Sequence, residues 1–227
     1  MNRKQVVVLA ASPKPQGQAA SDRLAQIAAE TLRGETADVQ IIHAGETLAK
    51  EKTDEAFAAM AAADALIVVF PLYIFCLPGL TMRFLQRYWQ YALQLPARKQ
   101  TAVYSVINCG FPEPEINGEA SRVVGRFAQA VGGRYGFGIL IGGGGMAAMQ
   151  ASPVKRMLAE YREALLRIRA EIEAGTCAPA ENVNLRIRFP RRLYLFMGNV
   201  GWRRWVRRYG GKVSDLYARP YQPADDT

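Results

Sequence analysis

The chain alternates short, continuously apolar segments with longer segments of helical periodicity. The apolar runs are rich in β-branched residues and predict buried strands over Gln5–Ala10, Ala37–Ala44, Ala65–Phe70, Thr101–Asn108 and Tyr135–Ile141. Between them, apolar residues on one helical face predict helices over Ser21–Arg33, Asp54–Ala62, Leu80–Leu93 and Glu119–Val131. A last, long helix is the best marked, because Ser152 suits its N-cap, Pro153 its first turn and Gly175 its end.

This order of elements predicts an α/β fold. Strands that are apolar on both faces are typical of a parallel sheet covered by helices on both sides. Right-handed crossovers then give an open, doubly wound parallel sheet. For its five strands we expect the common order 2-1-3-4-5. We expect this domain to span residues 1–176. Residues 177–227 would form a basic, aromatic and helical C-terminal extension that starts with the linker Cys177–Asn182.

In such sheets, ligands bind beyond the carboxyl ends of the strands, at the point where the strand order reverses. Here that point lies between the first and third strands, so the loops 11–21, 71–79 and 108–118 would surround the site. The first loop lies within the stretch ASPKPQGQAASD (residues 11–22). It contains neither GxxxxGK[ST] nor GxGxxG, and the absence of the first motif argues against nucleotide triphosphate hydrolysis. Its Ser12, Gln18 and Ser21 could still hold a phosphate with the amides at the start of the helix. The alternative is an ordinary strand-to-helix connection capped by Ser21.

The other two loops favour an aromatic ligand. The second, PLYIFCLPG, is unusually apolar, so a flat cofactor could stack on Tyr73, or the loop could pack under a neighbour or in a homodimer interface. In the third, NCGFPEPEING, Gly110 permits close approach of the backbone. Glu113 and Glu115 could serve as acid–base residues, but we interpret them as a solvated rim. The run Gly142–Gly145 is either a flexible turn or a wall of backbone amides beside the site.

Composition narrows the chemistry. Half of the 227 residues are hydrophobic, which allows a sizeable core, but no apolar run is long enough to span a membrane. The three cysteines, Cys76, Cys109 and Cys177, form no CxxC motif, which argues against a metal site and suits a reducing compartment. The single histidine, His43, closes an apolar segment, so we interpret it as a strand-end residue and not as a catalytic base.

The net charge of +9 belongs to the C-terminal extension. Nine cations and no acid lie between Leu185 and Val213, leaving 20 basic and 20 acidic residues in the rest of the chain. Helical spacing places Trp202, Trp205 and Tyr209 on one face, with arginines on the flanks, which is typical of an interfacial helix at anionic lipid. Alternatively, the aromatic side chains dock on the sheet domain or on a second subunit. Nucleic-acid binding is the weaker interpretation, because no recognised motif accompanies the charge.

These loops resemble those of the flavodoxin-like superfamily, and most closely its NAD(P)H-dependent FMN reductase branch. ASPK (Ala11–Lys14) with Ser21 is similar to the GSPR/K phosphate loop of that family, although Ala11 replaces its usual glycine. The segment Asp64–Arg87 is similar to its strand, P-x-Y turn and following helix, and NCGFPEPE (Asn108–Glu115) resembles its third flavin loop. A subgroup also ends in a basic, aromatic tail with a D-L-Y…P-Y pattern, as do Asp215–Tyr217 and Pro220–Tyr221 here.

The resemblance implies FMN as cofactor and NAD(P)H as co-substrate. The FMN phosphate would lie in the first loop, at Ser12, Lys14, Gln18, Ala19 and Ser21. The ring would lie between the second and third loops, at Pro71, Leu72, Tyr73, Ile74, Asn108, Cys109, Gly110 and Phe111. Flavin carries its own redox chemistry, so no catalytic side chain and no metal ligand is named.

Three functions follow from this interpretation. The first is an oxidoreductase that transfers a hydride from NAD(P)H through the flavin to a quinone, a free flavin or a similar small acceptor. The second is a flavodoxin-like electron carrier, although such carriers are typically shorter and acidic. The third is a protein of this fold that has lost its cofactor and serves as a binding module. We expect a cytoplasmic location, with a weak peripheral contact at the inner, anionic membrane face as the alternative that the tail raises.

Overall fold

A computed structural model describes residues 3–146 and 152–218 of the chain. The chain forms two compact units, Met1–Ile187 and Arg188–Thr227. The first unit contains the sheet and the second contains the basic tail. The expected motif residues Pro220 and Tyr221 lie outside the described part of the chain.

The sheet of the first unit has six parallel strands in the order β2-β1-β3-β4-β5-β6. Their bounds are β1 Lys4–Ala10, β2 Ala37–His43, β3 Ala65–Pro71, β4 Ala102–Asn108, β5 Arg134–Gly142 and β6 Val183–Arg186. The first five strands and their order confirm the prediction, and β3 and β4 are buried almost throughout, as expected for a sheet covered on both faces.

The expected number of five strands is wrong, because β6 pairs with β5 from Ile139 opposite Val183 to Gly142 opposite Arg186. The segment alternates as an edge strand should: Leu185 and Ile187 are buried, while Arg186 and Arg188 are exposed. This strand carries the first unit past residue 176, where we expected the sheet domain to end, and as far as Ile187.

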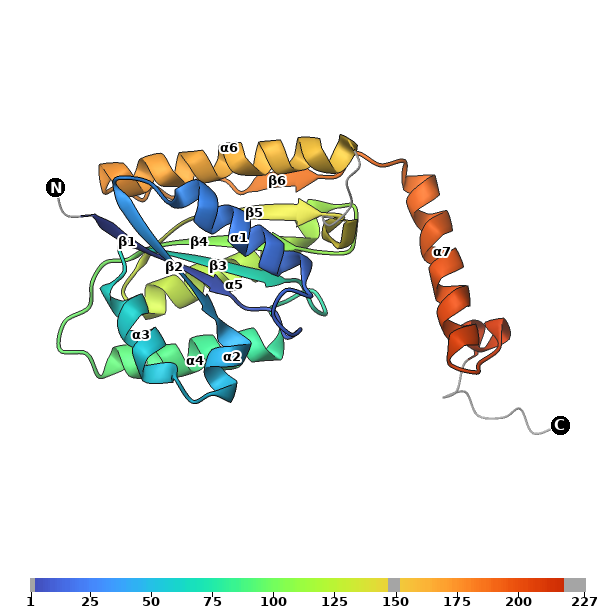
Figure 1. Cartoon of the computed structure of the whole chain (residues 1–227), viewed down its shortest axis with the longest axis horizontal. Helices are drawn as coiled ribbons and strands as arrows, with labels where there is room; N and C mark the ends of the chain where they lie inside the picture. The colour runs from blue at the N-terminus through green and yellow to red at the C-terminus, as the bar shows by residue number, and fades with distance from the viewer. Residues whose placement is uncertain (1–2, 147–151, 219–227) are drawn as a thin grey trace. The chain divides into compact units, whose positions relative to one another are not determined.

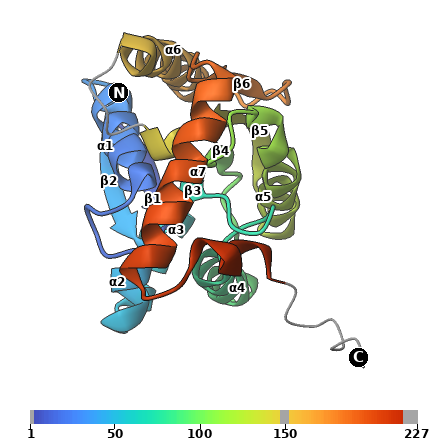
Figure 2. The same ribbon diagram turned by 90° about the vertical axis from the view of Figure 1, so that its right-hand side faces the viewer.

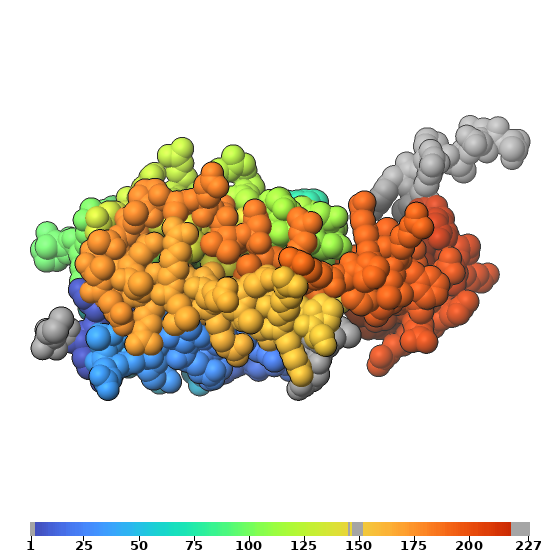
Figure 3. Space-filling model, turned by 90° about the horizontal axis from the view of Figure 1, so that it is seen from above, coloured from blue at the N-terminus to red at the C-terminus, as the bar shows by residue number. Residues whose placement is uncertain are grey.

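The helices of the first unit cover both faces of the sheet. Figures 1 and 2 show α1 and α6 on one face and α3, α4 and α5 on the other. Seen from above, α6 runs along the outer surface of the unit (Figure 3). The bounds are α1 Ala20–Leu32, α2 Ala44–Ala49, α3 Thr53–Ala62, α4 Gly79–Leu93, α5 Gly118–Ala130 and α6 Ser152–Ala174, with 3-10 turns η1 Pro114–Asn117 and η2 Gly144–Met146.

Aromatic and polar contacts fix these helices on the sheet. Phe57 of α3 packs edge-on against Phe84 of α4, with ring centroids 5.3 Å apart. On the other face, the buried Tyr161 hydroxyl of α6 donates to the carbonyl oxygen of Leu24 in α1, at 2.9 Å. Burial raises the pKa of Tyr161, so this hydroxyl keeps its proton and remains a donor.

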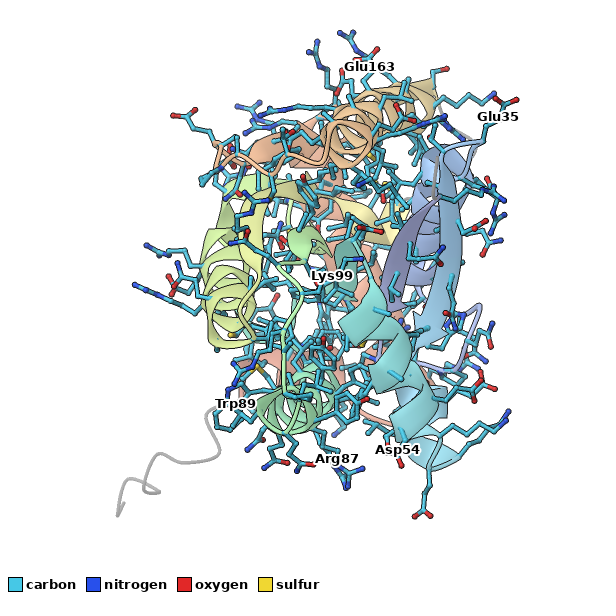
Figure 4. The ribbon with its side chains drawn as sticks, turned by 90° about the vertical axis from the view of Figure 1, so that its left-hand side faces the viewer. Glu35, Asp54, Arg87, Trp89, Lys99 and Glu163 are labelled. Atoms are coloured by element: carbon cyan, nitrogen blue, oxygen red, sulfur yellow. The ribbon has the colours of Figure 1, made fainter. Side chains whose placement is uncertain are left out.

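The amino ends of the strands are closed by an ionic cluster around Asp64. Its carboxylate accepts a hydrogen bond from the Gln5 amide at 2.8 Å and pairs with Lys99 at 2.9 Å. Figure 4 looks onto this edge, where Lys99 lies in the connection before β4. The loops expected to carry function all lie at the opposite, carboxyl edge.

The second unit consists of helix α7 (Arg191–Arg208) and the 3-10 turn η3 (Val213–Tyr217). The helix confirms the expected helical extension, and its Trp202 and Trp205 rings meet edge-on at 5.9 Å. Helical spacing places Trp202 and Trp205 on the side opposite Arg203, Arg204 and Arg207. Among residues 3–146 and 152–218, no helix is both long enough and apolar enough to cross a bilayer.

Candidate functional site

The three predicted loops are joined to one another at the carboxyl edge of the sheet. The buried Thr81 hydroxyl of α4 donates to the Ala11 carbonyl oxygen at 2.7 Å, which ties the first loop to the helix that follows the second. The Leu72 amide donates to the Asn108 carbonyl oxygen at 2.8 Å, which ties the second loop to the third. This edge carries every predicted site residue: Ser12, Lys14, Gln18, Ala19, Ser21, Pro71, Leu72, Tyr73, Ile74, Asn108, Cys109, Gly110 and Phe111.

Two serines of the first loop are buried. Ser12 Oγ accepts a hydrogen bond from the Lys14 amide at 3.1 Å, which shapes the start of the loop, while the Lys14 side chain is exposed. Ser21 is in the first turn of α1, is almost wholly buried, and its hydroxyl has no partner among the described residues. A buried hydroxyl without a partner is costly, so a ligand atom at this position would stabilise it.

Asp22, in the first turn of α1, contacts this loop, and the sequence did not point to it. Its Oδ2 accepts hydrogen bonds from the amides of Gly17 at 2.8 Å and Ala19 at 3.3 Å. The Gln18 amide donates instead to the Pro15 carbonyl oxygen, and the Gln18 side chain is exposed. The chain's own carboxylate therefore holds one amide within the loop, that of Gly17, and the amide of Ala19, the residue before α1.

The tip of the second loop is a tight turn in a strained conformation. Tyr73 and Cys76 exchange both backbone hydrogen bonds, at 2.9 and 3.0 Å. The two residues between them, Ile74 and Phe75, have positive φ values of 49° and 61°, which are unfavourable for a β-branched and an aromatic residue. Such conformations cost about 1–3 kcal/mol each and persist mainly where they serve a function.

This turn presents apolar side chains to solvent. Ile74 is 93% exposed and Phe75 is 60% exposed. The Phe75 ring lies nearly parallel to that of Phe111 in the third loop, with centroids 6.0 Å apart and planes at 14°. The second and third loops thus share an exposed aromatic surface at the carboxyl edge of the sheet, and the half-exposed Tyr73 adjoins it in sequence.

The third loop begins with a second buried polar atom that lacks a partner. Asn108 ends β4 opposite Pro71 of β3, and its Oδ1 is buried without a hydrogen bond among the described residues. The neighbouring Cys109 thiol is buried and donates to the Phe111 carbonyl oxygen at 3.4 Å. Burial raises the pKa of this thiol, which favours its protonated form.

The glycine run at the end of β5 is hydrogen-bonded to the third loop. The amides of Gly143 and Gly144 donate to the carbonyl oxygens of Phe111 at 2.6 Å and Cys109 at 2.7 Å. A Cβ atom on Gly144 would lie 2.7 Å from the Cβ of Asn108, so this close approach requires glycine. The run is therefore a packing platform, and these two amides are used within the protein.

A groove of about 520 Å³ lies beside the first loop, on the side of β2. It is lined by residues of the first loop and by residues that follow β2: Ser12, Lys14, Gln16, Asp22, His43, Glu46 and Lys50 among them. His43 is the strand-end residue expected, and its Nε2 lies 3.1 Å from Gln16 Nε2. We did not expect residues after β2 to line a groove beside the first loop. The end of β2 could have indicated it, because β2 ends at the same edge of the sheet as β1.

The rim of the site is polar, as expected for Glu115. Its carboxylate pairs with Arg186 of β6 at 2.8 Å, and both side chains are more than half exposed. An exposed pair of this kind contributes little to stability. Glu115 is therefore an exposed, ion-paired residue at the rim of the third loop.

The comparisons with known proteins agree with this architecture. A family model described as flavodoxin-like fold matches residues 4–114. Solved structures of similar fold include an apo NADH:FMN oxidoreductase, which is 19% identical, with a TM-score of 0.54 over 73% of this chain and 88% of that one. The NAD(P)H:quinone oxidoreductase of Methanothermobacter marburgensis is 18% identical, with a TM-score of 0.52 over 76% and 98%. A flavone reductase is 12% identical, with a TM-score of 0.57 over 78% and 66%. A search of curated proteins finds no match.

Proposed function

Because the chain has a flavodoxin-like fold, we propose that it is an FMN-dependent oxidoreductase that uses NAD(P)H to reduce a small acceptor such as a quinone or free flavin. The observation that carries the proposal is the exposed aromatic surface of Phe75 and Phe111 at the ligand edge of the sheet. A flat ring is the ligand that would bury this surface and repay the strained turn that presents it. The oxidoreductases of similar fold support the same reading.

The first loop supplies groups that fit a phosphate. Ser21 Oγ is buried and without a partner, so it would gain a hydrogen bond from a phosphate oxygen. Lys14 would contribute positive charge, and the amino end of α1 favours an anion. The carboxylate of Asp22 opposes this fit, because it already holds the Gly17 and Ala19 amides.

The second and third loops supply groups that fit the ring. Phe75 and Phe111 offer two nearly parallel ring faces, and the unpartnered Asn108 Oδ1 offers an acceptor for an N–H donor. When bound there, FMN would supply the two-electron chemistry that links NAD(P)H to the acceptor. The residues of this chain would bind, orient and shield the reactants, and we assign no side chain as an acid or a base.

The contacts of Asp22 support one alternative function, a binding module without cofactor. A chain whose own carboxylate fills the phosphate-binding amides could be a module of this fold that works without FMN. An electron carrier is disfavoured by the net charge of +9. We also propose a cytoplasmic location, which suits a user of NAD(P)H with three free cysteines.

The visible spectrum of the purified full chain tests the proposal. We expect the protein to bind added FMN, to show a flavin spectrum after gel filtration, and to bleach when NADH or NADPH is added without oxygen. Re-oxidation by a quinone would establish turnover. A bound flavin that NAD(P)H does not reduce would favour an electron carrier. A protein that cannot be loaded with FMN would overturn the proposal and favour the cofactor-free module.

A further inference from the structure

Asp22 occupies the position at which an anion is expected in the first loop. Its Oδ2 accepts from the amides of Gly17 at 2.8 Å and Ala19 at 3.3 Å, immediately before α1. Gly17 has a φ of 81°, a conformation that favours glycine and that brings its amide to the carboxylate. The Asp22 side chain also lines the groove between the first loop and the residues that follow β2.

One anion can use these amides at a time. The amino end of a helix attracts negative charge through its free N–H groups and its dipole, and charge-assisted hydrogen bonds are stronger than neutral ones. A phosphate group that takes the same amides must first break both hydrogen bonds to Asp22. It then lies close to a displaced carboxylate of like charge, which repels it.

We propose that Asp22 is an internal competitor for the phosphate of FMN: it stabilises the first loop without ligand and lowers the affinity of the site for phosphate esters. This inference rests on the proposed FMN site and adds a determinant of cofactor retention to it. Loading of the protein with FMN then depends on release of the Gly17 and Ala19 amides. A flavin without phosphate is insensitive to this competition.

The test compares Asp22→Asn with the unaltered full chain. Asparagine keeps the size and an acceptor oxygen but removes the charge. We expect the Kd for FMN, measured by flavin fluorescence, to fall about tenfold, because the competing charge-assisted hydrogen bonds are gone. The Kd for riboflavin should stay unchanged. Without ligand, the Tm should fall by about 2–4 °C, because a helix-start contact is weakened.

Competition predicts that Asp22→Asn binds FMN more tightly although its Tm is lower, whereas a capping role alone predicts only the lower Tm. If Asp22 only caps α1, the Tm falls and the affinity for FMN stays unchanged or weakens, which overturns the inference. Asp54→Asn is the matched control, because Asp54 is an exposed carboxylate in the first turn of α3, as labelled in Figure 4, and it should leave FMN binding unchanged. If neither chain binds FMN or riboflavin, the proposed function fails along with the inference.

A second experiment uses NMR on the unaltered chain and so does not depend on whether the Asp22 variant folds. The amide resonances of Gly17 and Ala19 should shift on addition of FMN, since their acceptor changes from carboxylate to phosphate. Riboflavin should leave both resonances in place. Resonances that stay unmoved while FMN binds would show that these amides do not hold the phosphate, and the inference would be wrong.

Discussion

The Thr81 hydroxyl donates a 2.7 Å hydrogen bond to the carbonyl oxygen of Ala11, and both residues are buried. The bond joins the first turn of α4 to the start of the first loop, across 70 residues of sequence. It therefore fixes the position of the predicted phosphate loop relative to the helix that follows the aromatic turn. Ala11 itself extends β1, since its amide donates to the Val69 carbonyl oxygen at 2.8 Å.

Thr81→Val should destabilise the chain by about 1–3 kcal/mol, because it removes the donor from a buried carbonyl while keeping the side-chain shape. Urea unfolding followed by circular dichroism measures the change. Thr31→Val is the control, since its hydroxyl donates to Ile27 within its own helix, and it should cost less. Equal losses for the two variants would show that the Thr81 contact has no special weight.

Replacement of Ile74 should raise the stability of the protein and lower its affinity for flavin. Ile74 is 93% exposed with a φ of 49°, so Ile74→Asn loses no packing and gains a residue that tolerates this conformation. We expect the apo protein to gain about 1 kcal/mol of stability. At the same time, flavin affinity should fall severalfold, because apolar surface beside Phe75 is lost.

Glu51→Asn is the matched control for this trade-off. Glu51 is exposed with a φ of 54°, and it lies between α2 and α3, outside the three loops at the site. It should therefore gain stability by a similar amount while leaving flavin affinity unchanged. A loss of flavin affinity in Glu51→Asn, or none in Ile74→Asn, would contradict the role assigned to the turn.

The sixth strand gives a prediction about where the folded unit ends. Leu185 is buried in β6, so Leu185→Ala should cost about 2–5 kcal/mol in urea unfolding. Leu193→Ala, in the exposed surface of α7, should change stability by less than about 0.5 kcal/mol. If the Leu185 variant is as stable as the unaltered chain, residues 183–187 do not belong to the folded core.

The hydrophobic pattern was sufficient to predict five strands and the longer helices between them, and the common doubly wound order then gave their arrangement. β3 and β4 are buried almost throughout, and their apolar runs follow from that burial, while β2 is marked more weakly because Asp38 and Gln40 interrupt its run. β6 was missed because Leu185 and Ile187 alternate with Arg186 and Arg188, and we assigned those arginines to the charge of the tail. The two-residue periodicity was nevertheless present and could have been used.

The gathering of the three loops at one edge of the sheet was predictable, but the contacts within and between the loops were not. Parallel strand order alone brings the three loops to one edge, and all the predicted residues lie there. The role of Asp22 depends on the path of the loop between Gly17 and Ala19, which no periodicity encodes. Likewise, the six-residue α2, which brings Glu46 and Lys50 to the groove, is too short to show a helical period.

The charge and aromatic pattern of α7 predicts that the full chain adsorbs weakly to anionic vesicles. Trp202 and Trp205 lie on one side of the helix and three arginines on the other, so the rings can enter the lipid interface while the guanidinium groups meet headgroups. Co-sedimentation with phosphatidylserine vesicles should be detectable at low salt, fall steeply at physiological salt and be absent with neutral lipid.

The double variant Arg203→Gln with Arg204→Gln should abolish this co-sedimentation. The paired control, Arg122→Gln with Arg126→Gln on exposed positions of α5, should not change it. Adsorption that is independent of salt and lipid charge would exclude this mechanism and leave the aromatic side chains as a protein-docking surface.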